Sequence, residues 1–367
     1  MRTVWILGAG ASRAAYCGMP LVKDFMEEAL HRMRFSGNQG KRVLDFLRES
    51  YGYEEPSDVN IEELLTLAWC DVSYLDGQGV SVLQDHERSE RLYRAWDALR
   101  KVEALIVAVL FAAQQECLQR GDRVHDSLTE VIGTQDTIIS YNYDLLVDRA
   151  LWKVHRSSSD DYAVRFHGSV EGPGTSVRKE YVREPHVERC CTGASEGVPL
   201  LKLHGSLNWL GLASADLFTG DPEVFYLPEA ASISIGPDFW WTPFYLRSTD
   251  GSNDISQSGR LRPIIVPPTF GKTAWKGTPM GKLWPQAQAA LRNCDRVVII
   301  GLSLREADYQ TRWLLRTGLA VDRPRAEIDI VNTSLKDRDR LRRFFLYLGR
   351  VVEYGSVDKF LTGRTAA

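Results

Sequence analysis

The fold of this chain is decided by Thr3-Val4-Trp5-Ile6-Leu7-Gly8-Ala9-Gly10-Ala11-Ser12. The first five residues form a short, continuous apolar run that ends at a glycine, a pattern typical of a buried parallel strand. A helix is expected to begin at about Ser12. Glycines between a strand and a helix let a phosphate approach the backbone, and the helix N-terminus offers it N–H groups. The stretch predicts a βα unit with a pyrophosphate site or, as the alternative, a simple tight turn. In a pyrophosphate site, we expect a bulky residue at Gly10 to remove ligand binding while most of the fold is kept.

The pattern of an apolar run followed by polar residues recurs along the chain and alternates with helical periodicity. Apolar runs predict strands at 136–140, 200–203, 263–266, 296–300 and 327–331, and helices are expected at 143–152, 280–294, 306–317 and 335–348. Strands that alternate with helices favour an α/β fold with a doubly wound, parallel, Rossmann-like sheet. Residues 25–130 instead show helical periodicity. We therefore expect a Rossmann-like domain over 1–24 and 131–367, with 25–130 as a large helical insertion subdomain packed on it.

Composition narrows the class of protein. The chain has 367 residues, of which 44% are hydrophobic, so it can bury a full core. Its net charge of −3 gives no global basic field to favour nucleic-acid binding. Among six scattered cysteines only Cys190 and Cys191 are close, and they lack the two-residue spacer of a zinc site. The longest apolar run, 104–113, falls short of the roughly 20 residues that span a bilayer. We expect a cytoplasmic protein with reduced thiols, no metal and no membrane segment.

A second candidate segment, Ser140-Tyr141-Asn142-Tyr143-Asp144, follows the strand expected at 136–140. Because parallel strands end at one edge of the sheet, this segment should lie near the glycine turn. The amide of Asn142 can hold a ribose hydroxyl or a water through its donor and its acceptor. The carboxylate of Asp144 can accept a hydrogen bond from an amide or hydroxyl group of a ligand. The alternative is that Asn142 or Asp144 only caps the helix that follows.

Two His-Gly-Ser tripeptides compete for the position of a catalytic base, one at His204 and one at His167. An imidazole titrates near neutral pH, which suits it to general-base catalysis on a ribose hydroxyl. The apolar run 199–203 forms a credible core strand that leads into His204. The run before His167 is weaker and lies in a polar stretch. We therefore assign the base to His204 and keep His167 as the alternative.

Two further turns follow expected strands, at Gly301-Leu302-Ser303 and at Asn332. Each is either a ligand contact or plain turn chemistry. Two other nucleotide-binding motifs are only partly present. Arg13 replaces the third glycine of the dehydrogenase fingerprint, and Gly271-Lys272-Thr273 lacks the first glycine of a phosphate loop. A dehydrogenase is disfavoured and a nucleoside triphosphatase is excluded.

In order and spelling, these segments resemble the motifs of the sirtuin-like NAD-binding family. The glycine turn followed by Gly18-Met19-Pro20 is similar to the family's opening, and Asn142-Tyr143-Asp144 is similar to its Asn-x-Asp pair. The resemblance implies that NAD is bound as a substrate, that Asn142 and His204 are catalytic, and that Asp144 faces nicotinamide. It places ribose and phosphate contacts at 301–303 and a ribose contact at Asn332. The residues implied to bind NAD are Gly8, Ala9, Gly10, Ala11, Ser12, Pro20, Tyr141, Asp144, Gly301, Ser303 and Asn332.

The chain departs from the sirtuin deacylases in two places. Leu21-Val22-Lys23 stands where they have Asp-Phe-Arg, and the two Cys-x-x-Cys pairs of their zinc module are absent. The resemblance covers little of 25–130 and 211–260, and it is closest to the bacterial NAD-consuming branch. That branch implies an NAD hydrolase that acts as an anti-phage effector by depleting NAD. The alternatives are an NAD-dependent protein deacylase and a non-catalytic NAD- or ADP-ribose-binding sensor or scaffold.

Partners are also implied by the resemblance. Family members of this kind commonly assemble, so we expect a homo-oligomer. No sensor module is recognisable in the sequence, so activation is expected from a partner protein encoded nearby or from oligomerisation. The aromatic-rich stretch 211–260, with Phe239-Trp240-Trp241, either exposes apolar surface for such contacts or packs on its own core.

Overall fold

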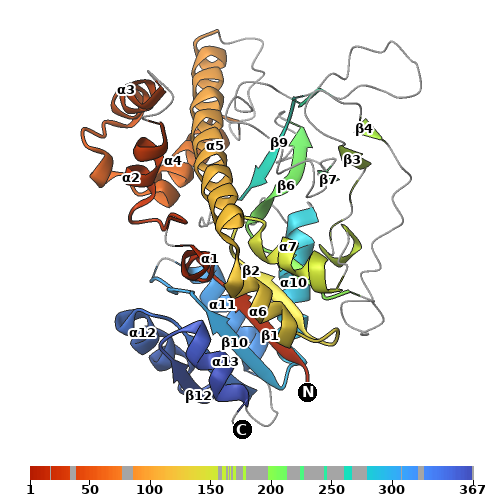
Figure 1. Ribbon diagram of the computed structural model, residues 1–367. Helices are drawn as coiled ribbons and strands as arrows, with labels where there is room; N and C mark the ends of the chain where they lie inside the picture. The colour runs from red at the N-terminus through yellow and green to blue at the C-terminus, as the bar shows by residue number, and fades with distance from the viewer. Residues whose placement is uncertain are drawn as a thin grey trace. The chain divides into compact units, whose positions relative to one another are not determined.

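The computed structural model describes most of the chain (Figure 1). The described residues are 1–16, 18–33, 39–76, 86–155, 159–162, 164, 166, 168–170, 177–178, 197–212, 224–226, 244–245, 260–266, 279–306, 308–320 and 326–365. They fall into two compact units. The first holds residues 1–16 and the described residues from Cys117 onward, and the second holds Gly18–Glu116.

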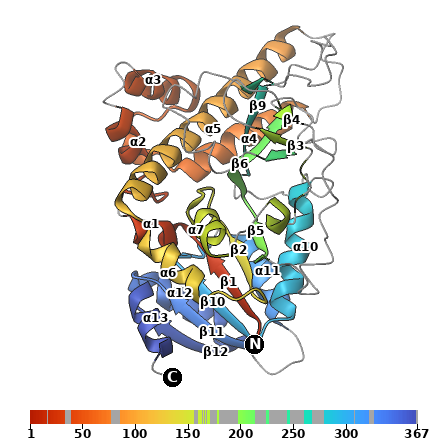
Figure 2. The ribbon, with the colours of Figure 1, turned by 45° about the vertical axis from the view of Figure 1, so that its right-hand side comes forward.

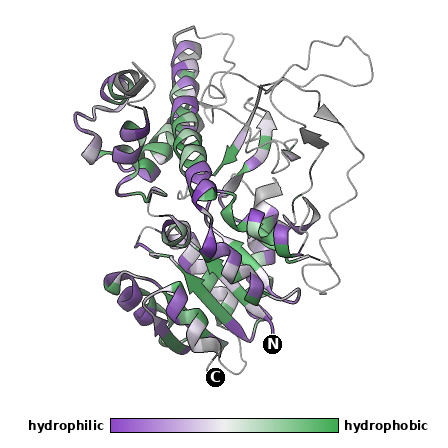
Figure 3. Cartoon of the chain, viewed as in Figure 1, coloured by the Kyte–Doolittle hydropathy of each residue, from purple (hydrophilic) through white to green (hydrophobic). Residues whose placement is uncertain are grey.

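A central sheet of six strands forms the core of the first unit. In sheet order the strands are β12 (Gly349–Tyr354), β11 (Ala326–Val331), β10 (Arg296–Ile300), β1 (Thr3–Leu7), β2 (Thr137–Ser140) and β5 (Leu200–Lys202). Every neighbouring pair is parallel. All residues of β1, β2 and β5 are buried, which explains why these strands are largely apolar (Figure 3). The expected α/β, Rossmann-like fold is confirmed.

Strand β1 lies at the centre of this topology, between β10 and β2. From β1 the chain builds outward to β2 and β5, and it then returns to β10 and builds in the opposite direction to β11 and β12. The order of the strands therefore reverses between β1 and β10. In open α/β sheets, ligands bind outside the carboxyl ends of the strands at such a reversal. The topology therefore predicts a ligand-binding site beside the residues that follow Leu7 and Ile300.

Helices cover both faces of the central sheet (Figures 1 and 2). On one face α6 (Arg123–Val131) packs against α7 (Leu146–His155) and against α1 (Ala9–Ala15). On the other, α10 (Pro279–Arg292) packs against α11 (Tyr309–Leu319). The last helices are α12 (Leu335–Phe345) and α13 (Val357–Thr365). Two covered faces are what a buried parallel sheet requires, because neither side of its strands tolerates water.

The first unit contains a second sheet that the sequence did not reveal. Its order is β4 (Val177–Arg178), β3 (Gly168–Val170), β7 (Val224–Tyr226), β6 (Gly205–Leu212), β9 (Arg260–Ile265) and β8 (Phe244–Tyr245). A short 3-10 helix, η4 (Ser159–Tyr162), precedes it. The run 263–266 was expected in the parallel sheet, and this is wrong: β9 pairs antiparallel with β6. A short apolar run fits either sheet, because its pairing partner is distant in sequence.

The second unit is helical. It contains α2 (Phe25–Met33), α3 (Gln39–Tyr51), η2 (Pro56–Asp58), α4 (Ile61–Asp76) and most of α5 (His86–Arg120). The Asn60 side chain begins α4 by accepting the backbone N–H groups of Glu62 and Glu63, at 3.0 and 3.3 Å. The insertion was expected to run to residue 130, whereas this unit ends at Glu116 and α6 belongs to the first unit. Among the helices that the structure describes, none has both the length and the apolar composition needed to cross a membrane.

Candidate functional site

The glycine turn after β1 packs directly on the turn after β10. Gly8 donates its N–H to Ile300 O and Gly10 donates to Gly301 O, both at 2.9 Å. A Cβ atom on Gly10 would lie 2.7 Å from Gly301 Cα, and Gly301 itself adopts a left-handed φ of +65°. These glycines are therefore required by the close approach of two backbones. The expectation that a bulky residue at Gly10 leaves most of the fold intact is wrong, because that side chain would enter the Gly301 backbone.

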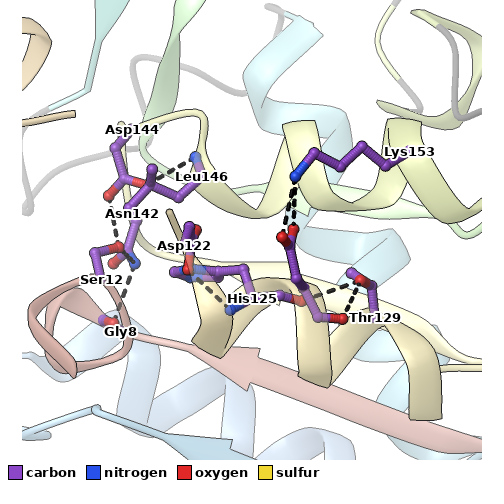
Figure 4. Close-up of polar contacts among 10 residues, drawn as sticks. Gly8, Ser12, Asp122, His125, Thr129, Asn142, Asp144, Leu146 and Lys153 are labelled. Atoms are coloured by element: carbon purple, nitrogen blue, oxygen red, sulfur yellow. Dashed lines mark hydrogen bonds and ion pairs between the residues drawn. The ribbon is translucent and has the colours of Figure 1, made fainter. Parts of the chain in front are cut away.

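Asn142 connects the turn after β2 with the turn after β1 (Figure 4). Its side-chain Nδ2 donates to Gly8 O at 3.1 Å and to Ser12 Oγ at 3.0 Å. A carbonyl oxygen can only accept, so the amide nitrogen must face Gly8 and the orientation of the amide follows. Asn142 is buried, with only 6% of its surface exposed. Its Oδ1 is buried and has no hydrogen-bond partner among the described residues. A buried acceptor without a partner is unusual in a folded protein.

Asp144 belongs to the same buried cluster. Its Oδ2 accepts the Ser12 hydroxyl at 2.7 Å, and its Oδ1 accepts the N–H of Leu146, the first residue of α7, at 3.2 Å. The helix-capping function that we kept as the alternative is thus present. Each carboxylate oxygen has further acceptor capacity, so capping does not exhaust what Asp144 can bind.

His204 lies two residues after the end of β5, in the turn where the chain leaves the central sheet and enters β6 of the second sheet. Gly205 makes this change of direction with a φ of +86°. The His204 ring is partly exposed and meets the ring of Tyr141 edge to face, with centroids 5.2 Å apart. Since β5 is the parallel neighbour of β2, His204 and Asn142 follow adjacent strand ends. The competing His167 lies outside the described residues.

Tyr141 and Tyr143 hold the surroundings of His204. Burial raises the pKa of the Tyr141 hydroxyl, so the phenol of Tyr141 stays neutral beside the His204 imidazole. The Tyr143 hydroxyl donates to Val266 O at 2.9 Å, and Val266 donates its N–H to His204 O at 2.8 Å. The backbone of His204 is therefore fixed from β9 as well as from β5.

The candidate ligand-binding residues after β10 and β11 already make hydrogen bonds to neighbouring protein groups. Asn332 Nδ2 donates to Leu302 O at 3.0 Å, and its Oδ1 accepts from Ser334 N at 2.9 Å, at the start of α12. The carbonyl of Ser303 accepts from Arg340 Nη1 at 3.1 Å. The turn chemistry that we kept as the alternative is present at Asn332. One amide N–H of Asn332 remains for a ligand.

The candidate residues are thus not equally well grouped. Hydrogen bonds join the glycine turn, Ser12, Asn142 and Asp144, while Gly301 packs on the same turn. Ala9 is exposed and Ala11 is buried beside them in α1. Ser303 and Asn332 follow the neighbouring strands β10 and β11. Pro20 is buried in the second unit, so the structure describes its position within that unit alone.

A buried hydrogen-bonded pair beside this cluster was not foreseen from the sequence: it joins Asp122, the N-cap of α6, to His125 of α6 (Figure 4). The His125 Nδ1 lies 2.7 Å from Asp122 Oδ2, and Asp122 also caps α6 by accepting His125 N. Burial lowers the pKa of His125, but the hydrogen bond and charge of Asp122 outweigh burial, and the net shift is upward. Asp122 three residues before a histidine, at a helix start, was the available signal.

Among the described residues at this edge of the sheet, neither a reactive thiol nor a metal-binding group is found. Burial, followed by the charges of Asp122 and Asp144, raises the pKa of Cys117 to about 12, so this cysteine remains a protonated thiol. Within the described part of the chain no group of three or more His, Cys, Asp or Glu side chains is placed to hold a metal ion. Cys190 and Cys191 lie outside that part, so the absence of a metal stays a prediction.

Comparison with known proteins does not identify a family for this chain. The chain matches no protein-family model, and no curated protein matches it. The sirtuin-like reading of the motifs therefore remains an interpretation, and function has to be argued from the site.

Proposed function

We propose that this protein is an NAD hydrolase that cleaves the bond between nicotinamide and ribose. One observation carries the proposal: Asn142 presents a buried, unpartnered Oδ1 at the strand-order reversal of a Rossmann-like sheet. Its amide nitrogen is already fixed by Gly8 and Ser12, so the free oxygen has a set direction. A ribose hydroxyl or a water is the donor that such an acceptor suits. The resemblance of the motifs to sirtuin-like proteins supports NAD as the molecule that supplies it.

The reaction consumes water and releases a proton. Water oxygen forms a bond to the anomeric carbon of the ribose as the bond to the nicotinamide nitrogen breaks. The electron pair of that bond goes to the positively charged ring, which leaves as neutral nicotinamide. ADP-ribose and one proton are the other products. Because the departing group is already activated by its charge, the protein's main tasks are to position the reactants and to exclude other nucleophiles.

Each candidate side chain has a distinct part in this proposal. Asn142 Oδ1 accepts from the attacking water or from a ribose hydroxyl. His204, partly exposed after the end of β5, takes the proton. Asp144 accepts from the carboxamide of nicotinamide with the acceptor capacity that Ser12 and Leu146 leave. The glycine turn and the 301–303 turn approach the phosphates and the adenosine-side ribose.

Release of nicotinamide from NAD by the purified protein tests the proposal, with the protein alone and together with the proteins encoded beside it. His204→Ala should lower the rate by about 10²–10⁴-fold, the usual contribution of general acid–base catalysis. Asn142→Ala should lower it by about 10²-fold, because the reacting group loses the acceptor that positions it. Asn293→Ala is the matched control, because this exposed asparagine of the α10 C-terminus only donates to Ala289 O. His167→Ala should also retain activity. Absence of nicotinamide release under every condition would refute hydrolysis, and full activity in His204→Ala would show that the wrong histidine was chosen.

The same assay separates the two alternatives. A deacylase would yield a deacetylated peptide together with acetyl-ADP-ribose. A sensor or scaffold would bind NAD or ADP-ribose, after exposure to candidate activators, without releasing nicotinamide. An acceptor for a ribose hydroxyl serves binding and cleavage alike, so release of nicotinamide is the measurement that separates hydrolysis from binding alone.

The biological setting belongs to the proposal as well. Depletion of NAD would arrest or kill an infected bacterial cell, so we propose an anti-phage effector that acts in the cytoplasm. Such an enzyme must be silent before infection. We therefore propose that it is a homo-oligomer, and that oligomerisation or a partner protein encoded nearby activates it.

A further inference from the structure

Lys202, the last residue of β5, is fully buried. It stands two residues before His204, and its aliphatic stem runs inside the core of the first unit. A lysine in this position is exceptional, because lysine is almost never fully buried unless it is paired. Because Lys202 lies within the apolar run 200–203, its sequence context predicts a strand and indicates no function for the lysine.

The ammonium group of Lys202 binds two groups of the segment that follows β2. Its Nζ donates to the backbone oxygen of Asp144 at 2.6 Å and to Asp148 Oδ2, on α7, at 2.9 Å. The first bond holds the end of the turn that carries Asn142. The second makes a buried ion pair, since both Lys202 and Asp148 are almost without exposed surface.

The network continues from Asp148 back to the histidine segment. Tyr162 donates its hydroxyl to Asp148 Oδ1 at 2.5 Å and accepts from Asn208 Nδ2 at 3.0 Å. Ser206 then donates to Asn208 Oδ1 at 2.6 Å. Burial, followed by the charge of Asp148, raises the pKa of Tyr162 well above its usual value, so the phenol keeps the proton it donates. The chain of bonds starts at the carbonyl of Asp144 and ends two residues after His204.

Stability alone is a poor explanation for this arrangement. Replacing a buried ion pair with well-packed apolar side chains is often neutral or stabilising, because the charges lose their hydration. Backbone bonds from Leu203 N to Ser140 O and from Leu207 N to Tyr143 O already tie the two segments together, each at 3.0 Å. Lys202 adds a bond at Asp144, next to the groups that the proposed reaction uses.

We propose that Lys202 is a positioning residue for NAD cleavage. It holds the turn that carries Asn142 and Asp144 in a fixed position relative to the strand that carries His204. The inference rests on the proposed function, because it assigns Lys202 to the same site. A displacement of reacting groups by about 1 Å can lower a rate about 10²-fold, so loss of the bond to Asp144 should lower kcat.

The test compares Lys202→Met/Asp148→Asn with Asp148→Asn. Methionine keeps the length of the stem, and the asparagine still accepts from Tyr162 without leaving a carboxylate unpaired in the core. We expect the double variant to show a kcat about 10–100-fold below that of Asp148→Asn, with KM changed by less than about 2-fold. Amide hydrogen exchange within 141–146 should be faster in the double variant alone. Lys153→Met is the matched control, because its bond to Asp126 lies on the surface of α7.

The two readouts distinguish failure of this inference from failure of the proposed function. Equal kcat and equal exchange in the folded double variant and in Asp148→Asn would overturn the positioning role. A rise in KM alone would also overturn it, since it would indicate loss of substrate binding. If the wild-type protein releases no nicotinamide, the proposed function fails, and exchange at 141–146 then decides alone whether Lys202 positions the turn.

Discussion

The hydroxyl of Ser12 orients two side chains of the proposed site at once. It accepts from Asn142 and donates to Asp144, while Ser12 itself is 2% exposed. The orientation of the Asn142 acceptor therefore depends on Ser12, to which the proposed reaction assigns no chemical step. This dependence can be tested separately from the catalytic residues.

Ser12→Ala should cost about 1–3 kcal/mol of the free energy of unfolding, because it leaves a buried amide N–H and a buried carboxylate oxygen without this partner. NAD cleavage should fall as the Asn142 amide loses one of its two fixed contacts. Thermal unfolding and nicotinamide release measure the two effects. Ser50→Ala, at an exposed position of α3, is the control and should change stability by less than about 0.5 kcal/mol. Wild-type activity in Ser12→Ala would contradict the assigned orientation.

The Asp122–His125 pair predicts a pH dependence of stability. The pKa of His125 is raised in the folded protein, so its contribution is complete below the unfolded value of about 6.5 and is lost as pH rises through the folded pKa. The pKa of Asp122 is lowered, because the hydrogen bond and charge of His125 outweigh burial, so its contribution is lost only in acid. The stability difference between wild type and His125→Gln should shrink above about pH 6.5, by at most about 1.4 kcal/mol per pH unit. Urea unfolding at several pH values measures it, and a constant difference would contradict the pairing.

Single residues also show which parts of the candidate site can be predicted from the sequence. Asn142 and His204 were identifiable because each follows an apolar strand in a distinctive order. Lys202 was hidden because a lysine within an apolar run carries no sign of its partner, and Asp148 lies in a helix 54 positions away. Contacts between distant residues depend on the pairing of β2 with β5, which the sequence does not state.

The connection from β5 to β6 is the element on which the position of His204 depends. Gly205 has a φ of +86°, and a Cβ atom there would lie 2.1 Å from Ile264 O in β9. Both the backbone conformation and the space require glycine. A side chain would have to push β9 away from β6, and with it the Val266 contact to His204.

Gly205→Ala should therefore lower the free energy of unfolding by about 2 kcal/mol or more and reduce NAD cleavage. Chemical denaturation and the nicotinamide assay measure these changes. Gly133→Ala is the matched control, since a Cβ there would meet only Asp136 Oδ2, at 3.9 Å. An equal, small effect of both substitutions would show that the turn is not under this constraint.

Among the elements, burial on both faces decided which were predictable. Strands such as β1 and β10 are continuous apolar runs because they lie at the centre of the sheet. The edge strand β12 was missed, since Arg350 and Glu353 are exposed, charged residues that interrupt its apolar run. The second sheet was missed for a related reason: its strands are short and pair antiparallel across long connections. Edge and antiparallel strands leave a weaker local signal than central parallel ones.

For the whole molecule, the cluster of Gly8, Ser12, Asn142 and Asp144 lies within the first unit. The chemistry proposed here is therefore a property of the Rossmann-like unit and its second sheet. Association is a separate question, and the surface of that unit bears on it. Helix α11 exposes Tyr309 and Trp313, which are four positions apart and so share a face.

Phe239-Trp240-Trp241, to which the expected assembly was first assigned, lie outside the described residues. Within the described part of the chain, we expect exposed aromatic surface such as that of α11 to serve association. Light scattering should show a mass that increases with protein concentration. Trp313→Lys should shift association to higher concentration, because it places a charge on the shared face. Trp152→Lys, at an exposed position of α7 outside that face, is the control. A monomer at every concentration would reject assembly.

The contact between the 8–10 turn and Gly301 restricts how these positions can vary during evolution. A Cβ on any of the three glycines would enter the backbone of the opposite turn, at 2.1–2.8 Å. No second substitution can compensate, because the opposing atoms are main chain and cannot become smaller. All three positions should therefore be invariant in any descendant of this fold, whatever it binds or has ceased to bind. Invariant glycines here would record ancestry, and retention of both Asn142 and His204 would distinguish an active enzyme from an inactive relative.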